Sequence, residues 1–292
     1  MASVGVKNWL QRCAKWLVLF SSSLWAADMP SVAFFYGPQP PLEALRAYNV
    51  AVVEPTYVRY PAQHNRSARG EPHELFAYVS LGEVHPSRSY YAQLPKGCLA
   101  GSNEAWGSWV INQTCAEWQD FFLNIIIAPL WERGWRSFFL DTLDSYQLFA
   151  KTDSSRAAQV QAMVSLLRAL KSRYPDAKLM LNRGFELLPE VGHLTYAVAA
   201  ESLYQGYRAD QNSYGLVAEV DRKWLLAALK NVHEVYELPV VVIDYVDPKL
   251  NHWQTLARET AQRIRQLGYV PWVADGGLMH LGVGLPALQE EE

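Results

Sequence analysis

The sequence predicts one α/β domain folded as a single (β/α)8 TIM-type barrel. Eight short runs rich in β-branched and aromatic residues recur along the 292-residue chain, and most of them are followed by a loop and a helical pattern. Near-continuous apolar runs of this length are typical of parallel strands that are buried on both faces. A barrel of this class uses about 250 residues, so one domain accounts for the length.

The expected strands occupy the ranges 32–36, 50–54, 76–80, 137–141, 178–182, 196–201, 240–244 and 269–273. Apolar residues at helical spacing predict helices at 117–133, 154–174, 224–235 and 253–267. Gly134, Pro175 and Gly268 stand just past three of these helices and act as stop signals. The helices after the first, second and last strands are expected to be shorter. An open doubly wound sheet fits less well, because the turn after the first strand lacks the glycine-rich sequence of that fold.

The first 26 residues have the layout of a secretory signal peptide. Lys7, Arg12 and Lys15 carry all of their charge, an apolar run at 16–20 follows, and small residues lead to Ala26. Cleavage after Ala26 leaves a mature domain at 27–292, which we expect in the periplasm or outside the cell. A short amphipathic or anchoring helix is the alternative for this segment. No apolar run reaches the roughly 20 residues of a helical membrane span, so no integral span is expected after cleavage.

Net charge and cysteine content limit which partners and which cellular compartment are expected. The formal net charge is −3, and it becomes −6 once the three cations of the signal segment are removed. A mildly acidic domain is a poor ligand for nucleic acid, so none is expected as a partner. The remaining cysteines, Cys98 and Cys115, are expected to form a disulfide in an oxidising compartment, with two free thiols as the alternative. Neither has a nearby Cys or His partner, so no metal site is expected.

Polar residues follow the predicted strands where a (β/α)8 barrel places its active site, at the carboxyl ends of the strands. These positions hold Tyr36, Glu54, Tyr78, Glu83, Asp141, Asn182, Arg183, Glu201, Asp244, Tyr245, Trp272 and Asp275. The set offers no histidine cluster for a metal, no lysine for a Schiff base and no serine in an elbow motif. Carboxylates and aromatic rings remain, and such groups bind and hydrolyse glycosides without a cofactor.

Several of these segments resemble one glycosidase superfamily. The likeness is carried by FFLDTLDSY at 138–146, NRGFE at 182–186, AE at 200–201 and YVSLGE at 78–83. Over about residues 32–281 the chain is similar to glycoside hydrolase family 114, the endo-α-1,4-polygalactosaminidases, and to hydrolase domains of the PelA type.

The resemblance implies a retaining endo-hydrolase of α-1,4-linked galactosamine or N-acetylgalactosamine polysaccharide, with exopolysaccharide export machinery as a further partner. It carries the catalytic pair onto Asp141, as nucleophile, and Glu201, as acid/base. The expected substrate contacts are Tyr36, Tyr78, Glu83, Asn182, Arg183, Tyr204, Asp244, Tyr245 and Trp272. In this interpretation Asn182 and Arg183 bond a sugar or orient Asp141.

Simpler interpretations stay open. Asp141 could bond to backbone N–H groups of the next loop, Asp144 could cap that loop, and Glu201 could be a surface glutamate. The aromatic rings of Tyr245 and Trp272 could equally belong to the core. Two other functions are a non-catalytic polysaccharide-binding barrel that assists export, and a phosphosugar enzyme with its phosphate site at Gly276 and Gly277. Replacing Asp141 by Ala would leave the binding barrel unaffected but would inactivate the hydrolase.

Overall fold

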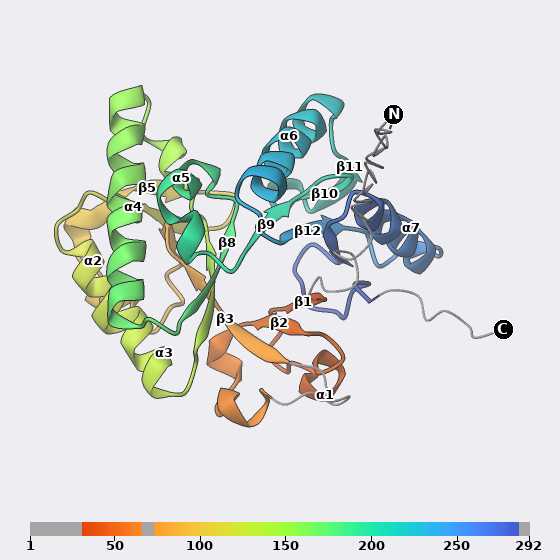
Figure 1. Cartoon of the computed structure of the whole chain (residues 1–292), viewed down its shortest axis with the longest axis horizontal. Helices are drawn as coiled ribbons and strands as arrows, with labels where there is room; N and C mark the ends of the chain where they lie inside the picture. Colours follow the sequence, from red (N-terminus) through yellow and green to blue (C-terminus); the bar gives the residue numbers. More distant parts are fainter. Residues whose placement is uncertain (1–30, 66–72, 286–292) are drawn as a thin grey trace, which may run out of the picture.

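The computed structural model describes residues 31–65 and 73–285 and shows a barrel (Figure 1). Its wall consists of β1 (Val32–Phe35), β2 (Val50–Val53), β3 (Glu74–Ser80), β7 (Ser137–Asp141), β8 (Lys178–Asn182), β9 (Ala197–Glu201), β12 (Val240–Tyr245) and β13 (Val270–Ala274). The strands follow this order in one sheet, and every neighbouring pair is parallel. β1 also contacts β13, so the sheet is nearly closed. The eight predicted runs are these strands, and the predicted (β/α)8 barrel is confirmed. The predicted signal segment, residues 1–26, lies outside the described residues.

The barrel strands are apolar because both of their faces are buried. Every residue of β12 and of β13 is buried. Phe34 of β1 and Phe139 of β7 meet edge to face, with ring centroids 5.1 Å apart. Because β1 and β7 are not neighbours in the sheet, this contact crosses the interior, which is filled by side chains rather than open as a pore.

Helices lie outside the strands. They are α1 (Leu42–Leu45), α2 (Trp118–Phe121), the π-helix η5 (Phe122–Ile127), α3 (Ala128–Glu132), α4 (Asp153–Arg173), α5 (Leu188–Val191), α6 (Glu219–Val235) and α7 (Trp253–Gln266). In Figure 1, α2, α3 and α4 lie on one flank and α6 and α7 on the other. Short 3-10 helices connect these elements at Pro55–Tyr57, Pro61–Gln63, Tyr91–Gln93, Lys96–Cys98, Ser145–Leu148, Phe185–Leu187, Gly192–Leu194 and Ala209–Gln211.

The predicted helix at 117–133 is present but divided, with the π-helix η5 between α2 and α3. Pro129 lies at the start of α3 and has no backbone N–H, so the regular hydrogen-bond pattern changes just before it. The segment ends at Gly134, whose φ of 99° is favourable only for glycine. The helix predicted at 154–174 is α4, which begins after a capping box formed by Thr152 and Ser155.

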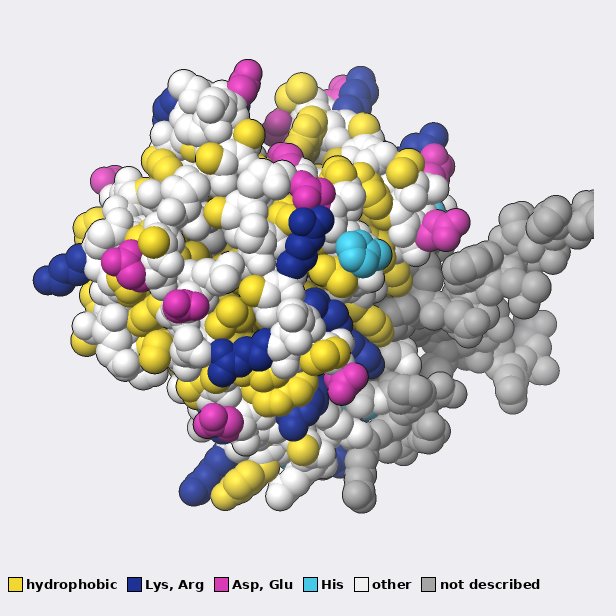
Figure 2. Space-filling model, turned by 60° about the vertical axis from the view of Figure 1, so that its left-hand side comes forward, with side chains coloured by type: hydrophobic (Ala, Val, Ile, Leu, Met, Phe, Trp, Pro, Cys, Tyr) yellow, Lys and Arg dark blue, Asp and Glu magenta, His cyan; other side chains and the backbone are white. Residues whose placement is uncertain are grey.

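The surface shows charges of both signs. On the face in Figure 2, acidic side chains are scattered singly, and Lys and Arg side chains gather mainly in its lower half. The negative net charge of the chain is therefore not concentrated on this face. Across residues 31–65 and 73–285, no helix combines the length and the apolar composition of a membrane span.

Two antiparallel insertions, which the sequence did not predict, extend from the barrel. The inserted sheet follows β3 and contains β4 (Glu83–Val84), β5 (Leu99–Asn103) and β6 (Ser108–Ile111), in the order β4-β6-β5. The hairpin follows β9 and contains β10 (Gln205–Arg208) and β11 (Ser213–Leu216). Each insertion leaves the barrel at the carboxyl end of a strand, which is the end where the active site was predicted.

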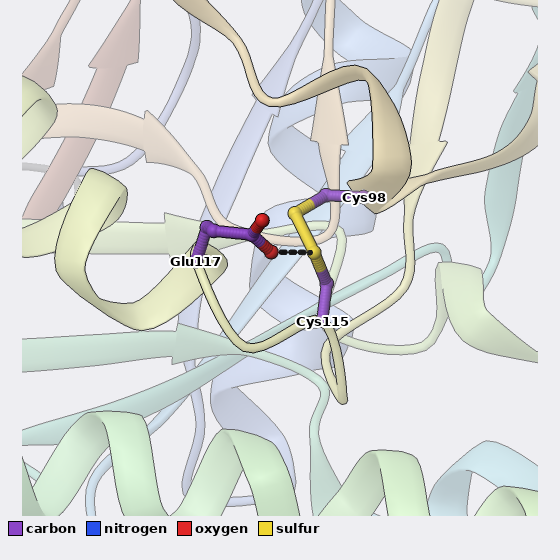
Figure 3. Close-up of side chains that lie close together, drawn as sticks. All are labelled: Cys98, Cys115 and Glu117. Atoms are coloured by element: carbon purple, nitrogen blue, oxygen red, sulfur yellow. Dashed lines mark hydrogen bonds between the residues drawn. A yellow bond between two sulfur atoms is a disulfide. The ribbon is translucent and has the colours of Figure 1, made fainter.

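The predicted disulfide between Cys98 and Cys115 is confirmed, with an S–S distance of 2.05 Å (Figure 3). It links the residue before β5 to a residue just after β6 and so closes the base of that pair of strands. Glu117 Oε2 lies 3.1 Å from the Cys115 sulfur. These three residues are close enough together to bind a metal ion, but two sulfurs joined in a disulfide carry no thiolate charge for one.

Candidate active site

Two carboxylates from non-adjacent strands meet at the carboxyl end of the barrel. Asp141 ends β7, Glu201 ends β9, and Asn182 ends β8 between them. The Asn182 Nδ2 amide donates hydrogen bonds to Asp141 Oδ1 at 2.7 Å and to Glu201 Oε1 at 2.9 Å. Because both acceptor oxygens bond to the same nitrogen, they cannot lie further apart than 5.6 Å, the sum of 2.7 Å and 2.9 Å. The two acids that the sequence paired are therefore close together.

Asp141 accepts three hydrogen bonds. Besides Asn182, the Tyr78 hydroxyl donates to Oδ2 at 2.8 Å and the Thr142 backbone N–H donates to Oδ1 at 2.8 Å. Burial, followed by the negative charge of Glu201, raises the pKa of Asp141 from 3.8 to about 6, although its hydrogen bonds oppose the shift. Asp141 therefore becomes protonated as the pH falls through about 6.

Glu201 is held through both its side chain and its backbone. The Tyr245 hydroxyl, at the end of β12, donates to Oε2, and the Arg183 guanidinium donates to the Glu201 carbonyl oxygen. Arg183 also forms an ion pair with Asp144, at 3.1 Å. Its φ of 57° lies in the left-handed region, which few residues other than glycine adopt. Arg183 thus orients the backbone at Glu201 and contacts Asp144, rather than bonding to Asp141.

Three tyrosines surround the pair, namely Tyr36, Tyr78 and Tyr245. The rings of Tyr36 and Tyr78 lie 4.7 Å apart, centroid to centroid. Burial is the largest cause that raises the pKa of all three hydroxyls well above the usual value, so they stay neutral at physiological pH. The Arg88 guanidinium lies 5.6 Å from the Tyr78 ring centroid and pairs with Glu54 at 2.8 Å. Glu54, another predicted strand-end acid, therefore supports the site indirectly.

Two adjoining cavities meet at the acid pair. The inner cavity has a volume of about 430 Å³ and is lined by barrel and inserted-sheet residues that include Tyr36, Tyr78, Glu83, Asp141 and Asn182. The hairpin cavity has a volume of about 680 Å³, and its lining includes Tyr207 and Tyr214 of the hairpin and Trp224 of α6. The residues that line both cavities are Trp106, Arg183, Glu201, Tyr245 and Gly276. A groove that continues on both sides of Glu201 can accept an extended chain.

Gly276 and Gly277 do not offer a phosphate site. The Gly276 N–H donates to the Tyr214 hydroxyl at 3.0 Å, and the Gly277 N–H lies 3.2 Å from Asp275 Oδ2, which accepts from it. Both N–H groups are already used, and the acidic side chain beside them would repel a phosphate. This arrangement disfavours the phosphosugar interpretation of the sequence.

Comparison with known proteins assigns the family. The family model of glycoside hydrolase family GH114 matches residues 12–286. The chain belongs to family GH114. A comparison with curated proteins finds no significant match.

Solved structures agree with this GH114 assignment. The glycoside hydrolase domain of PelA from Pseudomonas aeruginosa is 35% identical, with a TM-score of 0.77 over 87% of this chain and 98% of that domain. A variant of the same domain is 34% identical over the same shares, also with a TM-score of 0.77. Aspergillus fumigatus Ega3, solved in complex with galactosamine, is 12% identical with a TM-score of 0.60 over 87% and 94% of the two chains, so it shares the fold.

In this GH114 barrel, three of the residues predicted to contact substrate line neither cavity. Trp272 is fully buried, and its ring packs against Tyr48. The Tyr204 ring lies under the Arg263 guanidinium of α7, at 3.9 Å. Asp244 is fully buried and accepts hydrogen bonds from the backbone N–H groups of residues 203–205, and burial raises its pKa to about 6. Asp244 therefore positions the turn after Glu201.

Glu83 lines the inner cavity but is committed to contacts within the protein. Its side chain is only 4% exposed. It accepts hydrogen bonds from the Asn103 amide at 3.0 Å and from the hydroxyls of Ser108 and Ser145. These bonds connect β4, β5 and β6 to the loop after β7. Glu83 is thus an anchor of the inserted sheet that also lines the inner cavity.

Four aromatic residues of the GH114 groove were missed, namely Trp106, Tyr207, Tyr214 and Trp224. Trp106 lies in the turn between β5 and β6 and is 58% exposed. A large aromatic residue within a stretch rich in Gly and Asn is a signal that could have identified it. Tyr207 and Tyr214 flank the short polar stretch at 209–213, which is a hairpin signal.

Proposed function

We propose that this GH114 protein is an endo-acting, retaining hydrolase of polysaccharides built from α-1,4-linked galactosamine or N-acetylgalactosamine. The observation that carries the proposal is the acid pair bridged by Asn182 in a groove that continues on both sides. Retaining glycosidases hold their two carboxyl groups about 5–5.5 Å apart, whereas inverting enzymes hold them about 6.5–9.5 Å apart. The upper limit of 5.6 Å between the bridged oxygens of Asp141 and Glu201, the sum of 2.7 Å and 2.9 Å, supports retention. The sugar and linkage rest on the motif likeness, to which the 35% identity with the PelA domain adds support.

In the proposed first step, Asp141 attacks the anomeric carbon while Glu201 gives its proton to the departing glycosidic oxygen. The carbon–oxygen bond to the leaving sugar breaks as the bond to Asp141 forms. The motif likeness gives Asp141 the role of nucleophile, and the donors Asn182, Tyr78 and the Thr142 N–H hold its carboxyl group in one orientation. In the second step, Glu201 takes a proton from water, which attacks the same carbon and releases Asp141.

We place this activity in the periplasm or outside the cell, beside the machinery that exports the polymer. The signal-like segment at 1–26 supports an exported chain. The Cys98–Cys115 disulfide supports an oxidising compartment.

The test is digestion of purified α-1,4-linked galactosamine and N-acetylgalactosamine polymers by the mature chain, with products measured by mass spectrometry. The enzyme should release oligosaccharides of several lengths, and the first anomer seen by NMR should be α. Asp141→Asn and Glu201→Gln should each lower the rate by at least about a thousandfold, because each removes a group that bonds to or protonates the reacting atoms. Asp120→Asn, on the exposed surface of α2, is the matched control and should keep full activity.

The same experiment separates the hydrolase from a non-catalytic binding barrel. If every polymer stays intact while the chain and its Asp141→Asn variant bind it equally well, the protein is a carrier of polysaccharide. A first product with the β configuration would instead contradict the retaining mechanism alone.

A further inference from the structure

The two cavities differ in how they meet the acid pair. Asp141 lines the inner cavity only, whereas Glu201 lines both the inner cavity and the hairpin cavity. The groove is therefore asymmetric about the bond that is cut. One acid lies at the boundary between the cavities, and the other lies on one side of it.

Glycosidase chemistry converts this asymmetry into a direction for the substrate. The nucleophile must reach the anomeric carbon of the sugar that stays on the enzyme, and that sugar belongs to the non-reducing side of the cut. The acid must reach the oxygen that joins this sugar to the leaving one. With Asp141 as nucleophile, the retained sugar lies in the inner cavity, and the chain passes Glu201 before it continues.

We infer that the hairpin cavity is the binding site for the leaving-group side of the polymer, so that the reducing end runs along β10, β11 and α6. The inference rests on the proposed function, because it uses the roles of Asp141 and Glu201. The non-reducing part then lies over the barrel mouth and against the inserted sheet.

The hairpin cavity has the aromatic wall that a sugar site requires. Tyr207, Tyr214 and Trp224 line it, and pyranose rings stack on such faces through their C–H groups. Trp224 is 55% exposed, and its ring makes an edge-to-face contact with Phe185, with centroids 6.0 Å apart. The ring is thus supported from the protein side while it remains available to a ligand.

The hairpin is also held in place before any substrate binds. The Tyr214 hydroxyl accepts a hydrogen bond from the Gly276 N–H at 3.0 Å. A Cβ atom at Gly276 would lie only 2.3 Å from the Tyr207 ring, so the absence of a side chain allows this close approach. A preformed wall binds a sugar without the entropy cost of ordering a loop.

The experiment uses α-1,4-galactosamine oligomers with a fluorescent label at the reducing end, long enough to fill both cavities. The mature enzyme is compared with Trp224→Ala and with Val220→Ala, a control one turn earlier on α6 that is 72% exposed and lines neither cavity. When binding on the leaving-group side weakens, the oligomer more often occupies the groove with fewer of its sugars beyond the cut. Trp224→Ala should therefore shift the ratio of short to long labelled products upward by roughly fivefold, which corresponds to one stacking contact.

Trp224→Phe keeps a smaller aromatic face and should give an intermediate shift, while Val220→Ala should match the unaltered enzyme. A shift of Trp224→Ala toward longer labelled products would place the non-reducing side in the hairpin cavity and overturn the inference. An unchanged distribution would also overturn it, because no sugar would then contact this wall. If the unaltered enzyme cuts none of the oligomers, the proposed function fails, which is a different result from any change in product length.

Discussion

Replacing Asp141 by Asn should remove activity and make the folded protein more stable at neutral pH. The substitution removes a negative charge that is partly buried and close to Glu201. Asparagine can keep the three contacts of Asp141. Its oxygen can accept from Asn182 and from the Thr142 N–H, and its amide can donate to the Tyr78 hydroxyl oxygen.

The magnitude follows from the pKa of Asp141 in the folded protein. A rise from 3.8 to about 6 means that the folded state binds the proton more tightly than the unfolded state does. The stability that comes from this proton is fully present below about pH 4, and it is lost as the pH rises through about 6. The shift of about two units corresponds to about 3 kcal/mol. An asparagine side chain does not titrate and carries no such pH dependence, so the Asp141→Asn variant should gain about this amount above pH 7.

The assay is denaturant unfolding of the unaltered chain and the variant at pH 4 and at pH 7.5. The difference in free energy of unfolding should be small at pH 4 and should approach about 3 kcal/mol at pH 7.5, which would raise Tm by roughly 5–10 °C. Asp120→Asn, exposed on α2, should show no such change with pH. The reasoning is refuted if Asp141→Asn changes stability equally at both pH values, or if it destabilises the protein more at pH 7.5 than at pH 4.

Three further results are expected. For polymer hydrolysis, kcat/KM should fall as the pH falls below about 6, because protonation of Asp141 removes the anion that attacks the anomeric carbon; a rate that stays constant from pH 7 to pH 4.5 would contradict this. Trp106→Ala should raise KM for the polymer roughly fivefold, because this exposed ring lines both cavities, whereas Trp109→Ala on β6 should not, and kinetics at several polymer concentrations would separate the two. Replacing Cys98 and Cys115 together by Ser should lower the free energy of unfolding by about 3 kcal/mol, the entropy of closing a loop across a separation of 17 residues, and a loss below 1 kcal/mol in denaturant unfolding would count against the loop argument.

The barrel could be predicted from the sequence because a parallel strand buried on both faces has a simple apolar pattern. The runs that end at Asp141, Asn182 and Glu201 show it, with a polar residue directly after an apolar stretch. Because the carboxyl ends of barrel strands meet at one rim, these three side chains could be predicted to lie close together. Their mutual hydrogen bonds in the structure follow from the neighbouring positions of β7, β8 and β9.

The direction of individual side chains was harder to predict. Successive residues of a strand point to opposite faces, so Asp244 and Tyr245 could not both face the groove. Tyr245 reaches Glu201, while Asp244 binds the backbone of the next turn. For Trp272 the sequence leaves a substrate contact and a core position equally open, and in the structure its ring belongs to the core.

The insertions escaped prediction for a different reason. Their strands are two to five residues long, and most of their residues are at least partly exposed, so they lack the continuous apolar runs of the barrel. The inserted sheet is held by polar contacts such as those of Glu83, and contacts between distant residues leave no periodic signal in the sequence.

Each wall of the groove is held in place by hydrogen bonds to one buried carboxylate. Glu83 fastens the inserted sheet, and Asp244 fastens the turn that leads into the hairpin. A wall could therefore be transferred to another barrel only together with its carboxylate and the groups that donate hydrogen bonds to that carboxylate. Such a transfer would change which sugars the groove binds and how many of them. The two acids that cut the chain would keep their places on the barrel strands.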